Sequence, residues 1–226
     1  MARIALILGP TKSGKSRSIL NLNPEETMVI NVLKKDLPFK GSRKIYNEEN
    51  RNLVEMSDWT EIIPFMKMLD SDMPNIKTLI IDDARYITEK ELFKRAKEAG
   101  YVKFTEMAQH FQNIIETAEN MRQDLNVFLM MHDEDVYNDK VIVGKKVKLV
   151  GRMVDEHYNP LEVVTTCLYC TPTFDKDDKP RYQFFTQKAI VGGVEIPASS
   201  PEGMFETPTI PNDLSLVIEA FNDYYN

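Results

Sequence analysis

The feature that most constrains the fold of this chain is its beginning, where an apolar run leads directly into the stretch GPTKSGKS. Residues 3–8 (RIALIL) have the composition of a strand buried on both faces of a parallel sheet. Gly9 through Ser16 then match the pattern G-x-x-x-x-G-K-[ST], the P-loop. Residues 16–22 predict a short helix. Strand, glycine-rich loop and helix therefore come in the order that a phosphate cradle requires.

A phosphate group fits this loop through three kinds of contact. Backbone N–H groups of the loop would point inward, and the positive end of the following helix dipole would add to them. Lys15 would reach the β- and γ-phosphates, and the Ser16 hydroxyl would bind Mg²⁺. A purely structural turn has no use for lysine and serine directly after its second glycine. The residues expected to contact ATP are Gly9, Pro10, Thr11, Lys12, Ser13, Gly14, Lys15, Ser16 and Arg17.

Apolar runs and helical patterns alternate along the rest of the chain. Further strands are predicted at 27–32, 77–81, 126–131, 163–169 and 181–186. Strands separated by helices indicate an α/β fold with a mostly parallel sheet flanked by helices. We expect one domain, with a core at about 1–170 and an antiparallel, β-rich extension with a C-terminal helix at about 171–226.

Three helices and one long loop are predicted between and after these strands. Apolar residues at the spacing of an amphipathic helix cover 104–121. A second helix, 59–69, contains Pro64, which should kink or shorten it. Residues 190–212 are rich in proline, glycine, serine and threonine, so they predict a long surface loop before a last helix at 214–224.

Composition excludes several classes of protein. The chain has 226 residues, of which 42% are hydrophobic, so it can bury a core of its own. Its net charge of −7 excludes a generally basic surface, so any nucleic-acid contact would be a local patch. No run approaches the roughly 18 apolar residues of a membrane span, and the N-terminal run is too short for a signal peptide. A cytoplasmic protein without a membrane partner is expected. Cys167 and Cys170 would face opposite sides of one strand, which disfavours a metal or redox pair.

Two acids directly after the run TLII provide the second half of a nucleotide site. A P-loop needs a carboxylate to position the Mg²⁺ shell, and in open α/β sheets ligands bind beyond the carboxyl ends of the strands. Gly9 and Asp82 each follow the last apolar residue of a strand, so both should lie at the same edge. Asp82 is the expected Mg²⁺-shell residue, whereas Asp83 would either cap the next helix or orient the attacking water. His132 ends the run FLMM, where it would be either structural or a sensor of the γ-phosphate.

A basic segment follows His132 in this otherwise acidic chain. Residues 139–152 read DKVIVGKKVKLVGR. Two interpretations stay open, a solvated hairpin with alternating lysines or a mobile loop that contacts a phosphate backbone. The candidate DNA contacts are Lys140, Lys145, Lys146, Lys148 and Arg152. A second basic cluster, with aromatic residues that could stack on bases, comprises Lys34, Lys35, Lys40, Arg43 and Lys44 with Phe39 and Tyr46.

Several segments resemble a phage-encoded family of RecA-like ATPases, some of which are described as single-strand annealing recombinases. These segments are GPTKSGKS, NVLKKDLPFKG (31–41), TLIIDDARYI, GYVKFTEMAQH (100–110), the strand ending in His132, and SPEGMFETPTIPNDLSLVIEAFNDYY (200–225). The resemblance runs over nearly the whole chain. It therefore implies one RecA-like core.

The resemblance also implies a function. It implies binding and hydrolysis of ATP with Mg²⁺, oligomerisation into a ring or filament, and action on single-stranded DNA in recombination or replication. A phage single-stranded-DNA-binding protein is a candidate partner, and the compartment would be the host cytoplasm. By motif, Lys15, Ser16 and Asp82 become nucleotide and Mg²⁺ contacts. His132 becomes the γ-phosphate sensor.

Two departures from the family pattern bear on hydrolysis. RecA-like proteins usually place a catalytic glutamate after the second strand, whereas here that strand runs into KKDLPF, with Asp36 the nearest acid. Asp36 and Asp83 are therefore alternative candidates, and hydrolysis would be slow. The lysine that the family places before the SPEGMF segment is replaced by Ala-Ser-Ser at 198–200.

Two other functions stay open for this sequence. One is a nucleotide-gated assembly protein with little turnover, which agrees with the missing glutamate. The other is a small-molecule or nucleotide kinase, whose lid would need arginines to clamp the transferred phosphoryl group. Residues 133–152 contain one arginine, Arg152, among lysines, which disfavours the kinase.

Overall fold

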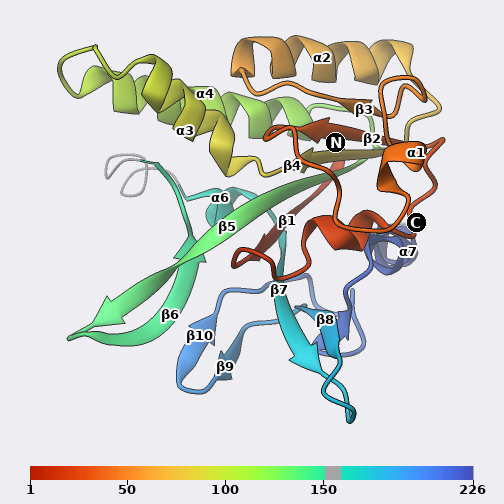
Figure 1. The fold of residues 1–226 in the computed structure, drawn as a ribbon, viewed down its shortest axis with the longest axis vertical. Helices are drawn as coiled ribbons and strands as arrows, with labels where there is room; N and C mark the ends of the chain where they lie inside the picture. Colours follow the sequence, from red (N-terminus) through yellow and green to blue (C-terminus); the bar gives the residue numbers. More distant parts are fainter. Residues whose placement is uncertain (151–158, 226) are drawn as a thin grey trace.

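The computed structural model describes residues 1–150 and 159–225, which form an α/β fold with a mostly parallel mixed sheet flanked by helices (Figure 1). Its strands are β1 (Arg3–Gly9), β2 (Thr27–Asn31), β3 (Leu53–Val54), β4 (Thr78–Asp82), β5 (Asn126–Asn138), β6 (Val141–Val147), β7 (Thr166–Phe174), β8 (Pro180–Phe185), β9 (Ala189–Val191), β10 (Val194–Ile196) and β11 (Thr209–Pro211). Its helices are the 3₁₀-helix η1 (Ser16–Ile19) and the α-helices α1 (Ser42–Ile45), α2 (Trp59–Asp72), α3 (Arg85–Lys94), α4 (Val102–Glu119), α6 (Pro160–Val163) and α7 (Leu214–Tyr225).

The main sheet has the strand order β11-β8-β7-β1-β5-β4-β2-β3. From β7 to β3 every neighbouring pair is parallel, which confirms the predicted parallel core. At the other end β8 and β11 are antiparallel, as expected for the C-terminal extension. Strand β5 continues beyond the core and pairs with β6, which in turn pairs with β10.

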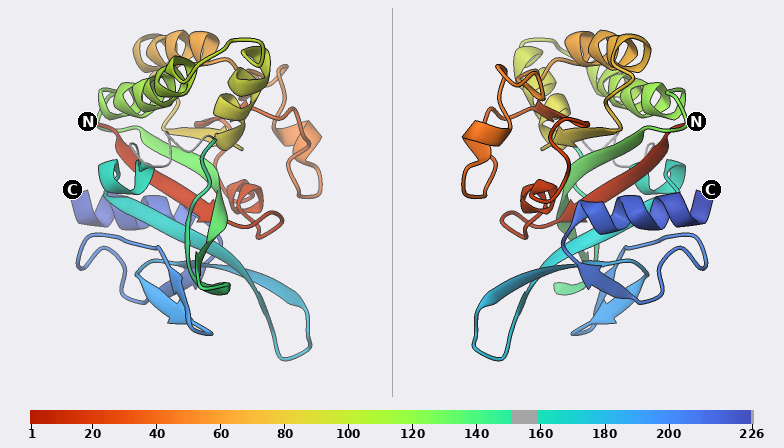
Figure 2. Two further views of the ribbon diagram at one scale, coloured as in Figure 1. Left: turned by 90° about the vertical axis from the view of Figure 1, so that its left-hand side faces the viewer. Right: turned by 90° about the vertical axis from the view of Figure 1, so that its right-hand side faces the viewer.

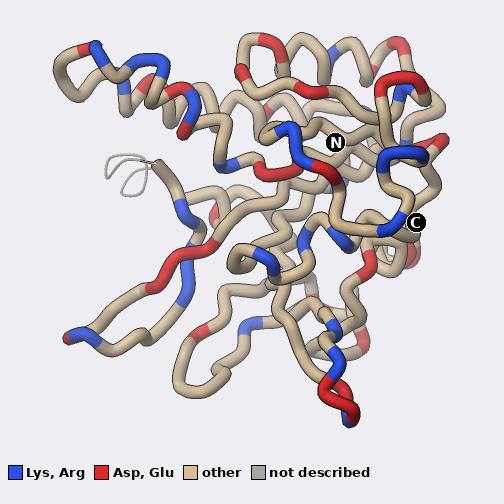
Figure 3. Tube along the Cα trace, in the orientation of Figure 1, with Lys and Arg blue, Asp and Glu red and all other residues tan. Residues whose placement is uncertain are grey.

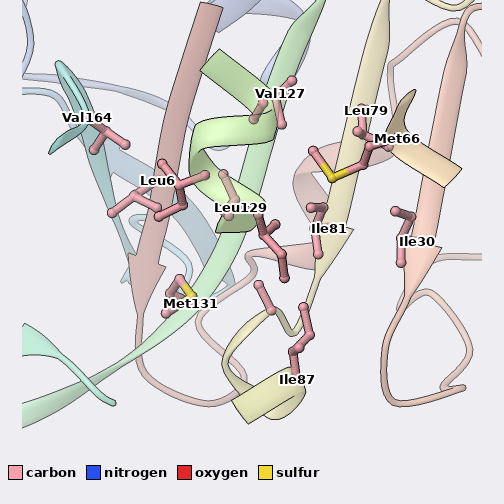
Figure 4. Packing of buried hydrophobic residues seen from close by; sticks show 14 of the residues in the cluster. Leu6, Ile30, Met66, Leu79, Ile81, Ile87, Val127, Leu129, Met131 and Val164 are labelled. Atoms are coloured by element: carbon pink, nitrogen blue, oxygen red, sulfur yellow. The ribbon is translucent and has the colours of Figure 1, made fainter. Parts of the chain in front are cut away.

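Apolar layers cover the sheet on both faces, because successive side chains of a strand point to opposite sides. On one face, Leu6 and Leu8 of β1 pack with side chains of α2 and α4. Figure 4 shows part of this layer. On the other face, Ala5 and Ile7 pack with η1 and α7. Figure 2 shows α7 on the side of the sheet opposite to α2 and α4.

Helix α2 continues to Asp72 although Pro64 lies inside it, so the predicted shortening is wrong. An interior proline costs roughly 3 kcal/mol, because it removes one hydrogen bond and crowds the preceding turn. Ile62, Met66 and Leu69 on the same helix are completely buried. Their burial stabilises the fold by about 1.5–3 kcal/mol each. The free energy gained by burying these three side chains therefore exceeds the cost of the interior proline.

Several predicted segments differ from the structure. The helix predicted at 16–22 is the four-residue 3₁₀-helix η1, and the strand predicted at 163–169 begins at Thr166. The strand predicted at 126–131 runs on to Asn138 and turns into β6, so the basic segment forms a hairpin as far as it is described. Arg152 lies outside the described residues. The loop predicted at 190–212 contains β10, β11 and part of β9. Both glycines between β9 and β10 have positive φ, which suits the tight turn of a hairpin.

The helices have the lengths and polarity of elements that pack on a sheet. Among the residues that the structure describes, no helix is long and apolar enough to cross a membrane. The longest, α4, has five buried residues along one side and polar residues elsewhere, which is the pattern of a helix packed on a sheet.

Candidate functional site

Three neighbouring strands bring the predicted site residues to one edge of the sheet. Strand β5 lies between β1 and β4, and His132 of β5 pairs in register with Gly9 of β1. Asp82 is the last residue of β4. The Ser16 hydroxyl donates a 2.8 Å hydrogen bond to Oδ1 of Asp82. The predicted meeting of the glycine-rich loop and the first acid is therefore observed.

Both glycines of the loop are required by close packing from the C-terminal strands. A Cβ at Gly9 would lie 2.4 Å from the backbone oxygen of Cys170 on β7. A Cβ at Gly14, whose φ is +101°, would lie 2.6 Å from the ring of Tyr182 on β8. Cys170 adds a hydrogen bond from its Sγ to the backbone oxygen of Ser13, 3.0 Å long. The loop is thus clamped by β7 and β8.

Lys15 is buried within the loop that precedes it. Its Nζ donates to the backbone oxygens of Gly9 at 2.7 Å and Pro10 at 2.8 Å. Burial lowers the pKa of Lys15, while nearby acids oppose that effect through space. Both direct partners are neutral carbonyls, so the ammonium remains a point charge that an anion in the loop would attract.

Asp82 is a buried carboxyl group that a cation would stabilise. Asp82 is 6% exposed. Burial and the neighbouring Asp83 raise the pKa of Asp82 to about 6, although Ser16 and Lys15 act to lower it. Hydroxyl and carboxylate oxygens are ligands that suit Mg²⁺. No group of three or more His, Cys, Asp or Glu residues able to hold a metal occurs in the described part of the chain. A Mg²⁺ ion here would take its remaining ligands from phosphates and water, as this ion usually does.

Asp83 points toward Lys35 rather than capping the next helix. Its backbone has φ of +57°, a conformation that is strained for residues other than glycine. Lys35 Nζ lies 3.2 Å from Asp83 Oδ2, and α3 begins after Ala84 without a side-chain cap. The capping alternative for Asp83 is therefore wrong. The carboxylate stands beside His132, whose Nδ1 is 3.7 Å from Oδ1.

His132 is a neutral imidazole in the middle of β5, at its last pairing with β1, so the prediction that His132 ends its strand is wrong. Burial, with a further contribution from Lys15, lowers the pKa of His132 to about 4. Its Nδ1 is buried and has no hydrogen-bond partner among the described residues. The edge of its ring meets Tyr86 at 5.8 Å between ring centroids. A ligand or water molecule that reached this nitrogen would complete its hydrogen bonding.

Asp36 does not join this group. Both of its oxygens accept hydrogen bonds from Arg43, at 2.7 and 2.6 Å, and this pair lowers the pKa of Asp36. It lines a separate hollow with Arg43, Tyr46 and other residues after β2. Of the two alternative acids, Asp83 therefore lies beside Asp82 and His132, whereas Asp36 does not.

A groove of about 570 Å³ lies beside the end of the loop, between η1, β8 and β11. Arg17 lines it with Tyr182, and the Arg17 Cζ lies 5.9 Å from the ring centroid of Tyr182. Asn212 also lines it and donates from Nδ2 to Cys170 Sγ at 3.0 Å. The Oδ1 atom of Asn212 is buried without a hydrogen-bond partner in the described ranges. Sequence reasoning missed Tyr182, because nothing local connects it to the loop.

Of the predicted DNA contacts, Lys140, Lys145 and Lys146 lie on the β5–β6 hairpin, where acids accompany them (Figure 3). Arg152 lies outside the described residues. Lys145 is hydrogen-bonded to Asp135, and Lys146 Nζ lies 3.1 Å from Glu134. Lys148 directly follows β6, and Lys145, Lys146 and Lys148 are together called the hairpin lysines. Lys140 lies at the turn, with positive φ. The structure therefore gives a hairpin of mixed charge rather than a purely basic patch.

The second basic cluster is likewise mixed in charge. Lys34 pairs with Glu55 at 3.2 Å, and Lys35 and Arg43 pair with the acids already described. Phe39 and Tyr46 contact each other edge to face, with ring centroids 6.2 Å apart. Tyr46 is buried, so its ring is not presented for stacking.

Comparisons with known proteins do not identify a family for this chain. The sequence matches no protein-family model and no curated protein. Any function proposed for the chain therefore rests on the loop, on Asp82, on the groove beside Tyr182 and on the sequence resemblance.

Proposed function

We propose that the chain is a Mg²⁺-dependent ATPase with a RecA-like P-loop core that acts on single-stranded DNA in phage recombination or replication. The observation that carries the proposal is the hydrogen bond from Ser16 to Asp82, formed between the loop and the end of β4. In a nucleotide-binding P-loop, these are the hydroxyl and the carboxylate that share the Mg²⁺ ion. Lys15 directly precedes Ser16, and its Nζ donates a hydrogen bond to the backbone oxygen of Gly9 in the same loop.

The loop would hold the phosphates mainly through Lys15 and its own N–H groups. Lys15 would exchange the carbonyls of Gly9 and Pro10 for oxygens of the β- and γ-phosphates. The helix that follows is a four-residue 3₁₀-helix, so its dipole contributes less than the sequence leads one to expect. Ser16 and Asp82 would hold Mg²⁺, which when bound neutralises part of the phosphate charge.

The groove beside the loop fits the base and ribose of the nucleotide. It begins at Arg17, the last residue expected to contact ATP, and so continues directly from the phosphate site. Tyr182 offers an aromatic side chain for a base, and stacking of this kind tolerates any base. Asn212 supplies a buried oxygen without a partner in the described residues, which would accept a hydrogen bond from a donor on the base.

Asp83 is the residue we assign to orient the attacking water. It adjoins Asp82 and stands beside His132, whereas Asp36 is held by Arg43. A neutral His132 would accept or donate one hydrogen bond at the terminal phosphate without adding charge. The missing glutamate after β2 leaves water activation to this shorter acid, so we expect slow turnover.

Action on single-stranded DNA rests on the sequence resemblance to phage RecA-like ATPases, as do the ring or filament and the cytoplasmic location. The hairpin lysines would have to exchange their acidic neighbours for phosphates on binding DNA. Binding that relies on such exchange should be weak and strongly sensitive to salt.

An ATPase assay with and without single-stranded DNA tests this function. We expect slow release of phosphate that requires Mg²⁺, increases with DNA and disappears in the Lys15→Ala variant. Lys67→Ala is the control, because Lys67 is an exposed lysine on α2 that lies outside the loop. Turnover unaffected by Lys15→Ala would contradict the proposal.

A nucleotide-gated assembly protein is the second candidate, and the capture of Asp36 by Arg43 favours it. Such a protein would bind ATP through the same loop but would hydrolyse very little. Light scattering with ATP and with ADP separates the two candidates. A size change with ATP, in the absence of measurable turnover, would select the assembly protein.

A further inference from the structure

A second cavity, of about 390 Å³, adjoins the beginning of the loop and is lined by Pro10, Thr11, Arg85, Tyr86 and His132 among others. The groove beside Tyr182 adjoins the end of the loop at Arg17. The two cavities therefore flank the phosphate cradle. A nucleotide whose base lies in the groove would present its terminal phosphate toward the Arg85 cavity.

Arg85 occupies an unfavourable position for a purely structural arginine. It is the first residue of α3, where the helix dipole already concentrates positive charge. Its side chain is only 13% exposed. Its Nε is buried and makes no hydrogen bond within residues 1–150 and 159–225. The guanidinium pairs with Glu89 at 2.5 Å and lies 4.9 Å from the ring centroid of Tyr86.

Two of the lysines around this cavity are paired with the acids that line it, Asp133, Glu134 and Asp135. Lys145 lies 3.6 Å from Asp133 and is hydrogen-bonded to Asp135. Lys146 lies 3.1 Å from Glu134. The remaining lysine in the lining, Lys148, lies on the chain after β6, and its backbone N–H donates to the His132 backbone oxygen. Arg85 differs from these lysines, because it combines burial with a free N–H group and a planar fork that matches phosphate.

We infer that Arg85 contacts the terminal phosphate of the bound nucleotide, so that the chain supplies its own phosphate-reading arginine. This inference rests on the proposed nucleotide binding at the loop. When nucleotide binds, the Arg85 guanidinium would turn from Glu89 toward the phosphate. Its contact with the Tyr86 ring would hold the plane of the guanidinium in place. Because ADP lacks the terminal phosphate, Arg85 distinguishes ATP from ADP. Arginines that contact a transferred phosphoryl group stabilise the charge of the transition state, so the contact would assist turnover.

The test is calorimetric titration of Mg²⁺ with ADP, and of Mg²⁺ with a non-hydrolysable ATP analogue, into wild-type protein and variants. Arg85→Ala should weaken binding of the ATP analogue about 10- to 100-fold, as removal of a charge-assisted hydrogen bond does, and leave ADP within about twofold. Arg85→Lys should be intermediate, because it keeps charge but loses the fork.

Arg95→Ala is the matched control for these variants. Arg95 follows the end of the same helix, is 18% exposed, and pairs with Glu91 in the same i, i+4 spacing, but it lines a different cavity. The Arg95→Ala variant should bind both nucleotides with the same affinities as the wild type. Glu89→Gln releases Arg85 without removing it and should tighten binding of the ATP analogue alone.

The outcomes separate this inference from the function on which it rests. Wild-type protein that binds neither nucleotide would refute the proposed function. Wild-type binding with an unchanged ratio of ATP-analogue to ADP affinity in Arg85→Ala, or equal weakening of both, would overturn the role of Arg85. If Arg85→Ala does not fold, Arg85→Lys and Glu89→Gln decide, since an unchanged ratio in both would also overturn it.

Discussion

Asp82→Asn is expected to stabilise the protein in the absence of Mg²⁺ while abolishing its turnover of ATP. Burial and Asp83 raise the pKa of Asp82 from 3.8 to about 6 in the folded chain. At roughly 1.36 kcal/mol for each pH unit between these values, ionised Asp82 lowers the free energy of unfolding by about 3 kcal/mol. Asparagine removes this penalty, and the favourable effects of Ser16 and Lys15 on the charged carboxylate are already contained in the pKa of about 6. The expected net gain is therefore about 3 kcal/mol.

The sign of this effect defines its pH window. Below pH 3.8 the Asp82 carboxyl is protonated in folded and unfolded chains alike, so the penalty is absent. Between 3.8 and about 6 the folded chain keeps a proton that the unfolded chain has released, and stability falls as pH rises. Above that range the penalty is constant. The advantage of the asparagine variant should therefore be absent near the lower limit and complete at neutral pH.

Thermal unfolding in EDTA, at about pH 4 and about pH 7.5, measures this difference. For a chain of this size, about 3 kcal/mol corresponds to a rise in Tm of about 6–12 °C. Asp124→Asn is the control with the opposite sign, because Lys77 lowers the pKa of Asp124. An asparagine variant at position 82 that is less stable than wild type at neutral pH would refute the reasoning. So would an advantage of equal size at both pH values.

Three further predictions concern the remaining parts of the site. Tyr182→Ala should weaken ATP binding about tenfold but leave binding of inorganic triphosphate unchanged, as titration of both ligands would show. Asp83→Asn should reduce steady-state ATP turnover far more than Asp36→Asn, and the reverse order would transfer the water-orienting role to Asp36. Replacing all three hairpin lysines with alanine should weaken single-stranded DNA binding for every sequence alike. It should also flatten the salt dependence by roughly 0.7 for each DNA phosphate that the variant no longer neutralises. An unchanged slope in a fluorescent-oligonucleotide titration would place the DNA-binding surface elsewhere.

The parts of the site that could be predicted from the sequence are those encoded locally. A buried strand followed by G-x-x-x-x-G-K-S placed Lys15 and Ser16, and a second buried strand placed Asp82 at the same edge. Parallel strands end at one edge of a sheet, so two local patterns were sufficient to predict the Ser16–Asp82 contact.

The parts that escaped prediction depend on tertiary packing. Tyr182 meets Gly14 only because β8 folds back beside β7, a pairing that no short pattern encodes. Helix α3 has no continuous apolar face, and only Ile87 and Thr88 are buried, so periodicity gave no signal for it or for Arg85. The hairpin of β9 and β10 lies in a stretch whose composition predicts a loop, although the pair Gly192–Gly193 is a turn signal.

Titration of Mg²⁺ with a non-hydrolysable ATP analogue into wild-type protein and Lys15→Ala tests the proposed nucleotide site most directly. We predict saturable binding by the wild type that requires Mg²⁺, and no binding by the variant, because the phosphates no longer meet a buried point charge. The variant should remain folded, as circular dichroism would show. Failure of the wild type to bind, or equal binding by a folded Lys15→Ala variant, would contradict the assignment of the loop.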